Sequence, residues 1–153
     1  MYQKILVPLD RSEFGECSLA HAKAIAIGCQ VPEVVLLHVI EPTPQAGVIA
    51  NEVGEDLMKN IDKEYKIKTE KYLSKTVDDL RSAGISATAE VVSGTADSEI
   101  LDYAKKNKVD LIILSTHGSS GIVRWAMGSV TDRVIRHSPI PVLVAAPKAC
   151  RIS

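Results

Sequence analysis

The sequence predicts an α/β fold, a doubly wound five-stranded parallel sheet with helices on both faces. Five short apolar runs alternate with longer helical stretches, an order typical of βα units. The runs are continuous rather than alternating, as in strands that are buried on both sides, and the third is the most mixed. Only 4% of the residues are aromatic whereas 46% are hydrophobic, so the core should be aliphatic. The predicted strands span residues 4–9, 33–40, 86–92, 110–115 and 141–146.

Helices are expected between these strands. The first should begin after Ser12, a residue type that caps helix N-termini, and end at Gly28. Another should open within residues 95–97, with its lysines at the C-terminal end where the helix dipole favours them. The last should start at residues 128–129 and stop before Pro139, because proline cannot continue a helix.

The second crossover, residues 41–84, is unusually long. Its apolar positions are spaced by four or eight residues, and each four-residue step drifts by about 40° around a straight helix. We therefore expect a long helix whose C-terminal half packs on the sheet, while its N-terminal half projects or breaks. Its many lysines and glutamates predict a solvated face. The apolar positions are Val53, Leu57, Ile61, Tyr65, Leu73 and Val77.

Length and charge narrow the possible functions. The 153 residues are typical of one domain, predicted over residues 1–146 and followed by a short tail, 147–153. A net charge of −1 argues against nucleic acid or an anionic membrane surface as the partner. No apolar stretch approaches the roughly 20 residues that span a bilayer. The first residues do not resemble a signal peptide, so a cytoplasmic protein is expected.

Two segments that follow predicted strands are candidates for a binding site, because ligands of doubly wound sheets bind at the carboxyl ends of the strands. The first is "VPLDRS", in which Asp10 directly follows the first strand. Asp10 could contact a ligand at the edge of the sheet. Alternatively, Asp10 or Ser12 could simply cap the helix that follows.

The second segment, "STHGSSGIVRWAMGS", follows the fourth strand. Gly118 and Gly121 would let a ligand approach the backbone, whose successive amides can bind an anion. Gly128 and Ser129 then open a helix, and a helix N-terminus also favours an anion. The pattern therefore suits phosphate groups, although a plain surface turn would have a similar composition. Hydroxyl donors come from Ser115, Thr116, Ser119 and Ser120.

The spacing S-T-H-G, nine residues, then G-S resembles the G-2x-G-9x-G-S/T signature of the universal stress protein family. The segments "KILVPLDRSEFGECSLAHA", "VVLLHVIEP" and "GSVTDRVIRHSPIPVLVA" also resemble that family, over about residues 2–146. The resemblance implies the strand order 3-2-1-4-5, frequent dimers and, in one branch, bound ATP or AMP. One position departs from the signature, because Ser115 replaces its first glycine.

The resemblance also implies roles for individual residues. Asp10 would lie near the ribose and adenine with Pro8 and Leu9 beside it, and the backbone of Val39 would meet the adenine edge. Phosphates would contact two groups of residues. The loop group is Ser115, Gly118, Ser119 and Gly121, and the helix group is Gly128, Ser129, Val130 and Thr131.

The remaining candidates give no catalytic or metal site. His117 could contact a phosphate or hold the turn through the backbone. His21, His38 and His137 lack the spacing of metal ligands, and the cysteines match no zinc motif. Mg²⁺, if present, would accompany the nucleotide. Any ATP hydrolysis should be slow, because no catalytic set of residues is evident.

The sequence thus favours an adenine-nucleotide-binding protein, a regulator of a stress response or of signalling with an unidentified protein partner. The last predicted strand, residues 141–146, would be an edge strand that joins two chains into a homodimer. Two alternatives remain: a nucleotide-free dimeric interaction module, and an enzyme of the ATP α-hydrolase type.

Overall fold

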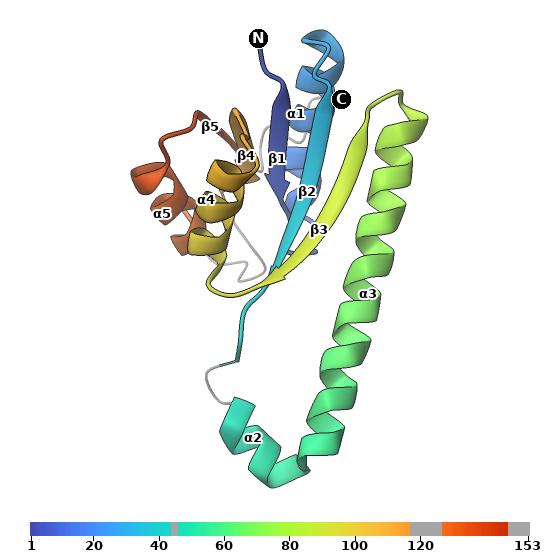
Figure 1. The fold of residues 1–153 in the computed structure, drawn as a ribbon, viewed down its shortest axis with the longest axis vertical. Coiled ribbons are helices and arrows are strands. Elements are labelled where there is room, and N and C mark those ends of the chain that lie inside the picture. The colour runs from blue at the N-terminus through green and yellow to red at the C-terminus, as the bar shows by residue number, and fades with distance from the viewer. Residues whose placement is uncertain (44–45, 117–126, 147–153) are drawn as a thin grey trace.

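A computed structural model describes residues 1–43, 46–116 and 127–146 and confirms the predicted fold class (Figure 1). The five-stranded sheet has the order β3-β2-β1-β4-β5, and the paired strands are parallel. The strands are β1 (Lys4–Pro8), β2 (Glu33–Ile40), β3 (Ala87–Ser93), β4 (Leu111–Ser115) and β5 (Val142–Ala145). The helices are α1 (Gly15–Gly28), α2 (Ala46–Val53), α3 (Glu55–Ser82), α4 (Ala96–Lys106) and α5 (Ser129–His137).

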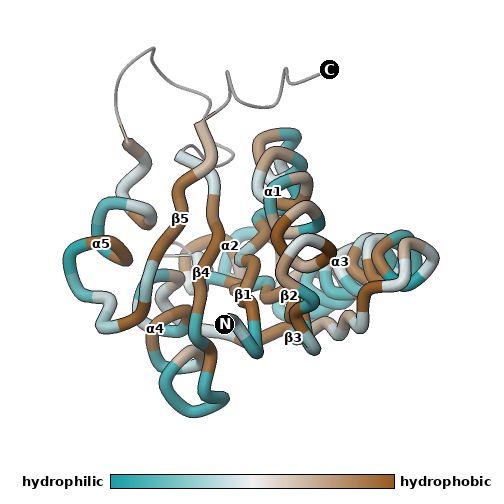
Figure 2. The backbone as a smooth tube through the Cα atoms, turned by 90° about the horizontal axis from the view of Figure 1, so that it is seen from above, coloured by the Kyte–Doolittle hydropathy of each residue, from teal (hydrophilic) through white to brown (hydrophobic). Residues whose placement is uncertain are grey.

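Alternate residues of each central strand enter two separate cores, one on each face of the sheet. On β1, Ile5 and Val7 pack with α1 and α3, whereas Leu6 packs with α4 and α5. All three side chains are fully buried. Figure 2 shows the strands between these two helix pairs. Burial on both faces explains why β1, β2 and β4 are continuously apolar in sequence, whereas β3 is largely exposed and mixed in composition.

The long second crossover forms two helices, and its first part projects beyond the sheet (Figure 1). The break falls at Gly54, whose φ of 90° is a conformation that favours glycine. Leu57 and Ile61 are about half exposed, at 49% and 50%. The buried residues of α3 all lie further along the helix, at Thr69, Leu73, Val77 and Leu80. The expectation of a packed C-terminal half and a projecting, broken N-terminal half is confirmed.

The start of the first helix was predicted wrongly. Helix α1 begins at Gly15 with Phe14 in the cap position, and no side chain caps it. The Ser12 hydroxyl instead donates to Asp10 Oδ1 at 2.5 Å. The chain is diverted at Arg11, whose φ of 66° is left-handed, so Ser12 belongs to the turn before the helix. The strand boundaries, by contrast, lie within one residue of those predicted.

In the described part of the chain, no helix is both long enough and apolar enough to cross a membrane. The predicted tail, residues 147–153, lies outside the described residues.

Candidate functional site

A cavity of about 330 Å³ opens at the carboxyl ends of the strands. It lies where the winding reverses, because β1 pairs with β2 on one side and with β4 on the other. Four separate segments contribute predicted site residues to its lining: the end of β1, the end of β2, the end of β4 and the start of α5. These residues are Pro8, Leu9, Asp10, Val39, Ser115, Gly128, Ser129, Val130 and Thr131.

The other predicted residues have different positions. Thr116 does not line the cavity, but its amide donates to the Ala145 carbonyl at 3.0 Å and its carbonyl accepts from the Gly128 amide at 2.6 Å. Thr116 thereby joins β5 to the start of α5. The predicted loop residues His117, Gly118, Ser119, Ser120 and Gly121 lie outside the described residues.

Further lining residues were not expected from the sequence. Glu41 and Leu114 come from strand ends, where the rule that located Asp10 could have found them. The carboxylate of Glu41 accepts a hydrogen bond from the Ala96 amide at 2.8 Å, at the start of α4. Leu37 lies on β2, and packing of the helices brings in Gly15, Ala96 and Ile100. The unexpected lining residues are Gly15, Leu37, Glu41, Ala96, Ile100 and Leu114.

The two ends of the cavity differ in charge. Asp10 and Glu41 are exposed carboxylates on the β1 and β2 side. Helix α5 starts on the other side, where the amides of its first turn, residues 129–131, have no acceptor within the helix. The Thr131 hydroxyl donates to the Ser115 carbonyl at 2.8 Å, which ties this helix start to β4. An anion is therefore favoured at the α5 end and disfavoured near the two carboxylates.

Asp10 takes part in the turn as well as in the cavity. Its Oδ1 accepts from the Ser12 amide at 3.0 Å and from the Ser12 hydroxyl. These bonds orient the carboxylate at the edge of the sheet. The two interpretations of this residue, a ligand contact and a local turn former, are thus compatible.

His38 lies beside the turn that contains Leu9 and Asp10. The sequence did not indicate it as a metal ligand, because its spacing from the other histidines fits no metal motif. It is buried on β2, and its Nδ1 lies 2.8 Å from the Leu9 carbonyl oxygen. Burial lowers the pKa of His38 below its ordinary value, and the positive charge of Arg11 lowers it further. The hydrogen bond to Leu9 and the charge of Asp10 oppose that shift of the pKa. Among the described residues no group of three or more could hold a metal ion.

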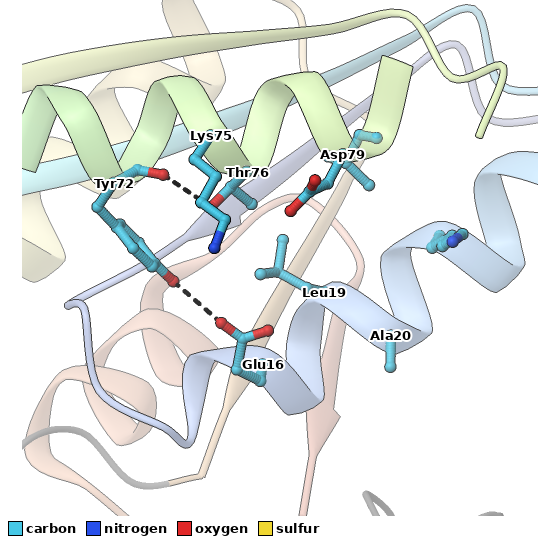
Figure 3. Close-up of a pocket in the computed structure, with 9 residues that line it drawn as sticks. Glu16, Leu19, Ala20, Tyr72, Lys75, Thr76 and Asp79 are labelled. Carbon is cyan, nitrogen blue, oxygen red and sulfur yellow. Dashed lines mark hydrogen bonds between the residues drawn. The ribbon is translucent and has the colours of Figure 1, made fainter. Parts of the chain in front are cut away.

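A second hollow, of about 400 Å³, lies between α1 and α3 and contains none of the predicted residues (Figure 3). The hydroxyl of Tyr72 donates to Glu16 Oε1 across it at 3.5 Å. Burial and the charge of Glu16 raise the pKa of Tyr72. The charged residues of this hollow carry both signs and offer no net attraction for an anion; they are Glu16, Lys23, Lys75 and Asp79.

The family model of the universal stress proteins matches residues 1–146. The chain belongs to the universal stress protein family. Universal stress protein MJ0577 of Methanocaldococcus jannaschii is 34% identical, with 97% of each chain covered. Universal stress protein MJ0531 of the same organism is 33% identical over 94% of this chain and 82% of that protein.

Solved structures of universal stress proteins share the fold. The structure of MJ0577 covers 95% of this chain and 96% of its own, with a TM-score of 0.77 and 35% identity. The protein of Archaeoglobus fulgidus, solved in complex with dAMP, has a TM-score of 0.68 at 22% identity and covers 94% of this chain and 98% of its own. The sheet order of this universal stress protein is therefore that of its family.

Proposed function

We propose that this universal stress protein binds an adenine nucleotide, AMP or ATP, in the cavity at the carboxyl ends of the strands. The observation that carries the proposal is that Asp10 and the N-terminus of α5 line one cavity. A nucleotide has hydroxyl donors on its ribose and anionic oxygens on its phosphates. The cavity offers a carboxylate for the first and amide donors for the second.

The apolar lining suits the base. Leu37, Ile100 and Leu114 are buried side chains that an adenine ring can cover without losing hydrogen bonds. The backbone at Val39, near the end of β2, would meet the polar edge of the ring. The ribose would then lie beside Asp10, whose carboxylate accepts hydrogen bonds from hydroxyl groups.

The phosphates would lie at the start of α5, at the amides of residues 129–131 and the hydroxyl of Ser129. Asp10 and Glu41 would repel them from the opposite end, so charge favours one orientation of the nucleotide. We propose that the loop after β4 completes the phosphate site with His117, Gly118, Ser119, Ser120 and Gly121. The dAMP complex of the Archaeoglobus fulgidus protein supports this class of ligand.

We propose that the protein binds the nucleotide without hydrolysing it rapidly, and that binding has a regulatory role. The carboxylates of the described cavity, Asp10 and Glu41, follow β1 and β2, whereas the phosphates are proposed to lie at the start of α5, so we expect neither carboxylate to activate a water there. Mg²⁺ would enter with ATP, bound by its phosphates. We also propose a homodimer through β5, whose residues Val142, Leu143 and Val144 are apolar yet only half buried at the edge of the sheet.

The test is to purify the protein without added nucleotide, denature it, and identify the released small molecules by mass spectrometry. Calorimetric titration of the nucleotide-free protein with AMP and ATP gives the affinities, and GTP serves as the control for the base. We expect AMP or ATP to bind and GTP to bind more weakly. A folded protein that releases no nucleotide and binds neither AMP nor ATP at millimolar concentration would contradict the proposal and favour the nucleotide-free interaction module.

A further inference from the structure

The turn that forms one wall of the cavity is held from the opposite side by a chain of hydrogen bonds. His38 Nδ1 lies 2.8 Å from the Leu9 carbonyl oxygen, and His38 Nε2 lies 3.1 Å from the Tyr65 hydroxyl on α3. The two rings are tilted by 47° with centroids 5.9 Å apart. Leu9 and its neighbour Asp10 line the cavity, whereas neither His38 nor Tyr65 does.

The partners of His38 determine where its protons lie. A carbonyl oxygen can only accept, so Nδ1 of the neutral ring carries the hydrogen and donates it to Leu9. Nε2 is then an acceptor, and the Tyr65 hydroxyl donates to it. The resulting chain runs from Tyr65 through His38 to the backbone of the turn. The Leu9 amide is also held, because it donates to the Leu37 carbonyl at 2.9 Å.

Arg11 provides a second connection from the same turn to α3. Its guanidinium carbon lies 5.1 Å from the centre of the Tyr65 ring, and Nη1 donates to Thr69 Oγ1 at 3.2 Å. The left-handed φ of Arg11, 66°, is costly for a residue with a side chain and persists only where neighbouring contacts hold it. Both neighbours of Asp10 in sequence, Leu9 and Arg11, are therefore tied to one turn of α3.

We define the projecting arm as residues 46–64, which form α2 and the first part of α3 (Figure 1). Tyr65 directly follows the arm along α3. Tyr65 is 41% exposed, and the first buried residue of α3, Thr69, follows one turn later. A displacement of the arm would therefore act first on Tyr65. It would reach Leu9 through His38, and it would reach Arg11 through the contact of its guanidinium with the Tyr65 ring.

We propose that Tyr65 and His38 are positioning residues for the nucleotide. They hold the Leu9–Arg11 turn so that the Asp10 carboxylate faces the cavity, and they couple the nucleotide affinity to the position of the arm. This inference rests on the proposed nucleotide binding. It adds to that proposal two residues outside the cavity and a route by which a partner that binds the arm would change the affinity.

Tyr65→Phe tests the proposal with little risk to folding, because it removes one oxygen from a partly exposed side chain. Tyr72→Phe is the matched control, since Tyr72 lies on the same helix but its hydroxyl faces Glu16 in the other hollow (Figure 3). Two readouts are needed: amide hydrogen exchange at Leu9 and Ser12 in nucleotide-free protein, and the dissociation constant for AMP. A melting temperature for each variant records any general loss of stability.

We expect Tyr65→Phe to speed exchange at Leu9 and Ser12 and to weaken AMP binding about two- to tenfold, as the loss of one hydrogen bond allows. Tyr72→Phe should change neither. A purely structural role would lower the melting temperature and leave the affinity for AMP unchanged. Equal AMP affinity and equal exchange in wild type and Tyr65→Phe would overturn the proposal.

A double-mutant cycle tests whether the effect passes through His38. In His38→Asn, the amide Nδ2 can still donate to the Leu9 carbonyl, but the acceptor for Tyr65 is lost. Tyr65→Phe should then have no further effect on exchange, whereas additive effects of the two substitutions would contradict the relay. The exchange data need no ligand. A wild type that fails to bind AMP would therefore contradict the proposed function and leave the relay to be judged by exchange alone.

Discussion

Gly128 offers the sharpest test of the phosphate site at the start of α5. The residue has φ −58° and ψ 148°, an extended conformation that any amino acid can adopt. Its backbone therefore does not require glycine. Gly128 lines the cavity, and the absence of a side chain there would allow the close approach of the proposed phosphate. Gly128→Val should fold normally and place a branched side chain where the phosphate would bind.

The expected loss follows from the hydrogen bonds at the helix start. A bond from an amide to a charged phosphate contributes about 1.5–3 kcal/mol, so exclusion from two amides costs about 3–6 kcal/mol. That range corresponds to an affinity for AMP lower by about a hundredfold to ten-thousandfold. Ser129→Ala removes a single hydroxyl donor to the same charged phosphate, a loss of about 1.5–3 kcal/mol or about tenfold to a hundredfold. The affinities should fall in the order wild type, Ser129→Ala, Gly128→Val.

Calorimetric titration with AMP measures these affinities, after circular dichroism has established that each variant is folded. Gly28→Val is the matched control, because Gly28 ends α1 and a side chain there would meet nothing within 4 Å. The control should bind AMP as the wild type does. A folded Gly128→Val that binds AMP within twofold of the wild type would refute a phosphate site at α5.

Three further predictions concern Asp10, His38 and β5. Asp10→Ala should weaken AMP binding by about tenfold, the loss of a charge-assisted hydrogen bond to the ribose, in a protein that circular dichroism shows to be folded; equal affinity would leave Asp10 only its role in the turn. The lowered pKa of His38 means that the unfolded chain binds more protons below pH 6.5, so the free energy of unfolding should fall as the pH drops below 6.5. When the free energy of unfolding is measured by urea titration at several pH values, it should change less with pH in His38→Asn than in the wild type. Light scattering at micromolar concentration should give a dimer for the wild type and a monomer for Val144→Lys, whose like charges would meet across β5; a monomeric wild type contradicts this interface.

The order of the elements followed from local patterns in the chain. Continuous apolar runs such as residues 33–40 predicted buried parallel strands, because a strand covered on both faces has no polar side. The four-residue spacing in the second crossover predicted that the long helix would leave the sheet. The break itself fell at Gly54, a residue that local conformational preference could have indicated.

The sequence was less informative at the start of α1. Ser12 is a favourable cap by composition, yet it bonds to Asp10, because the left-handed turn at Arg11 directs its hydroxyl there. Contacts with α3, more than fifty residues away in the chain, hold that turn in place. Local conformational preferences carry no information about such a contact.

Local chemistry also indicated the segments that follow β1 and β4, because carboxylates, glycines and hydroxyls after buried strands are conspicuous in sequence, whereas Val39 on β2 was implied only by the family resemblance. Their meeting with the start of α5 around one cavity was decided by the reversal of winding at β1. Only the tertiary structure placed Ile100 in that cavity and joined Tyr65 to Leu9 through His38. Such contacts depend on how whole helices pack against the sheet, and packing brings together side chains whose separation in sequence carries no local signal.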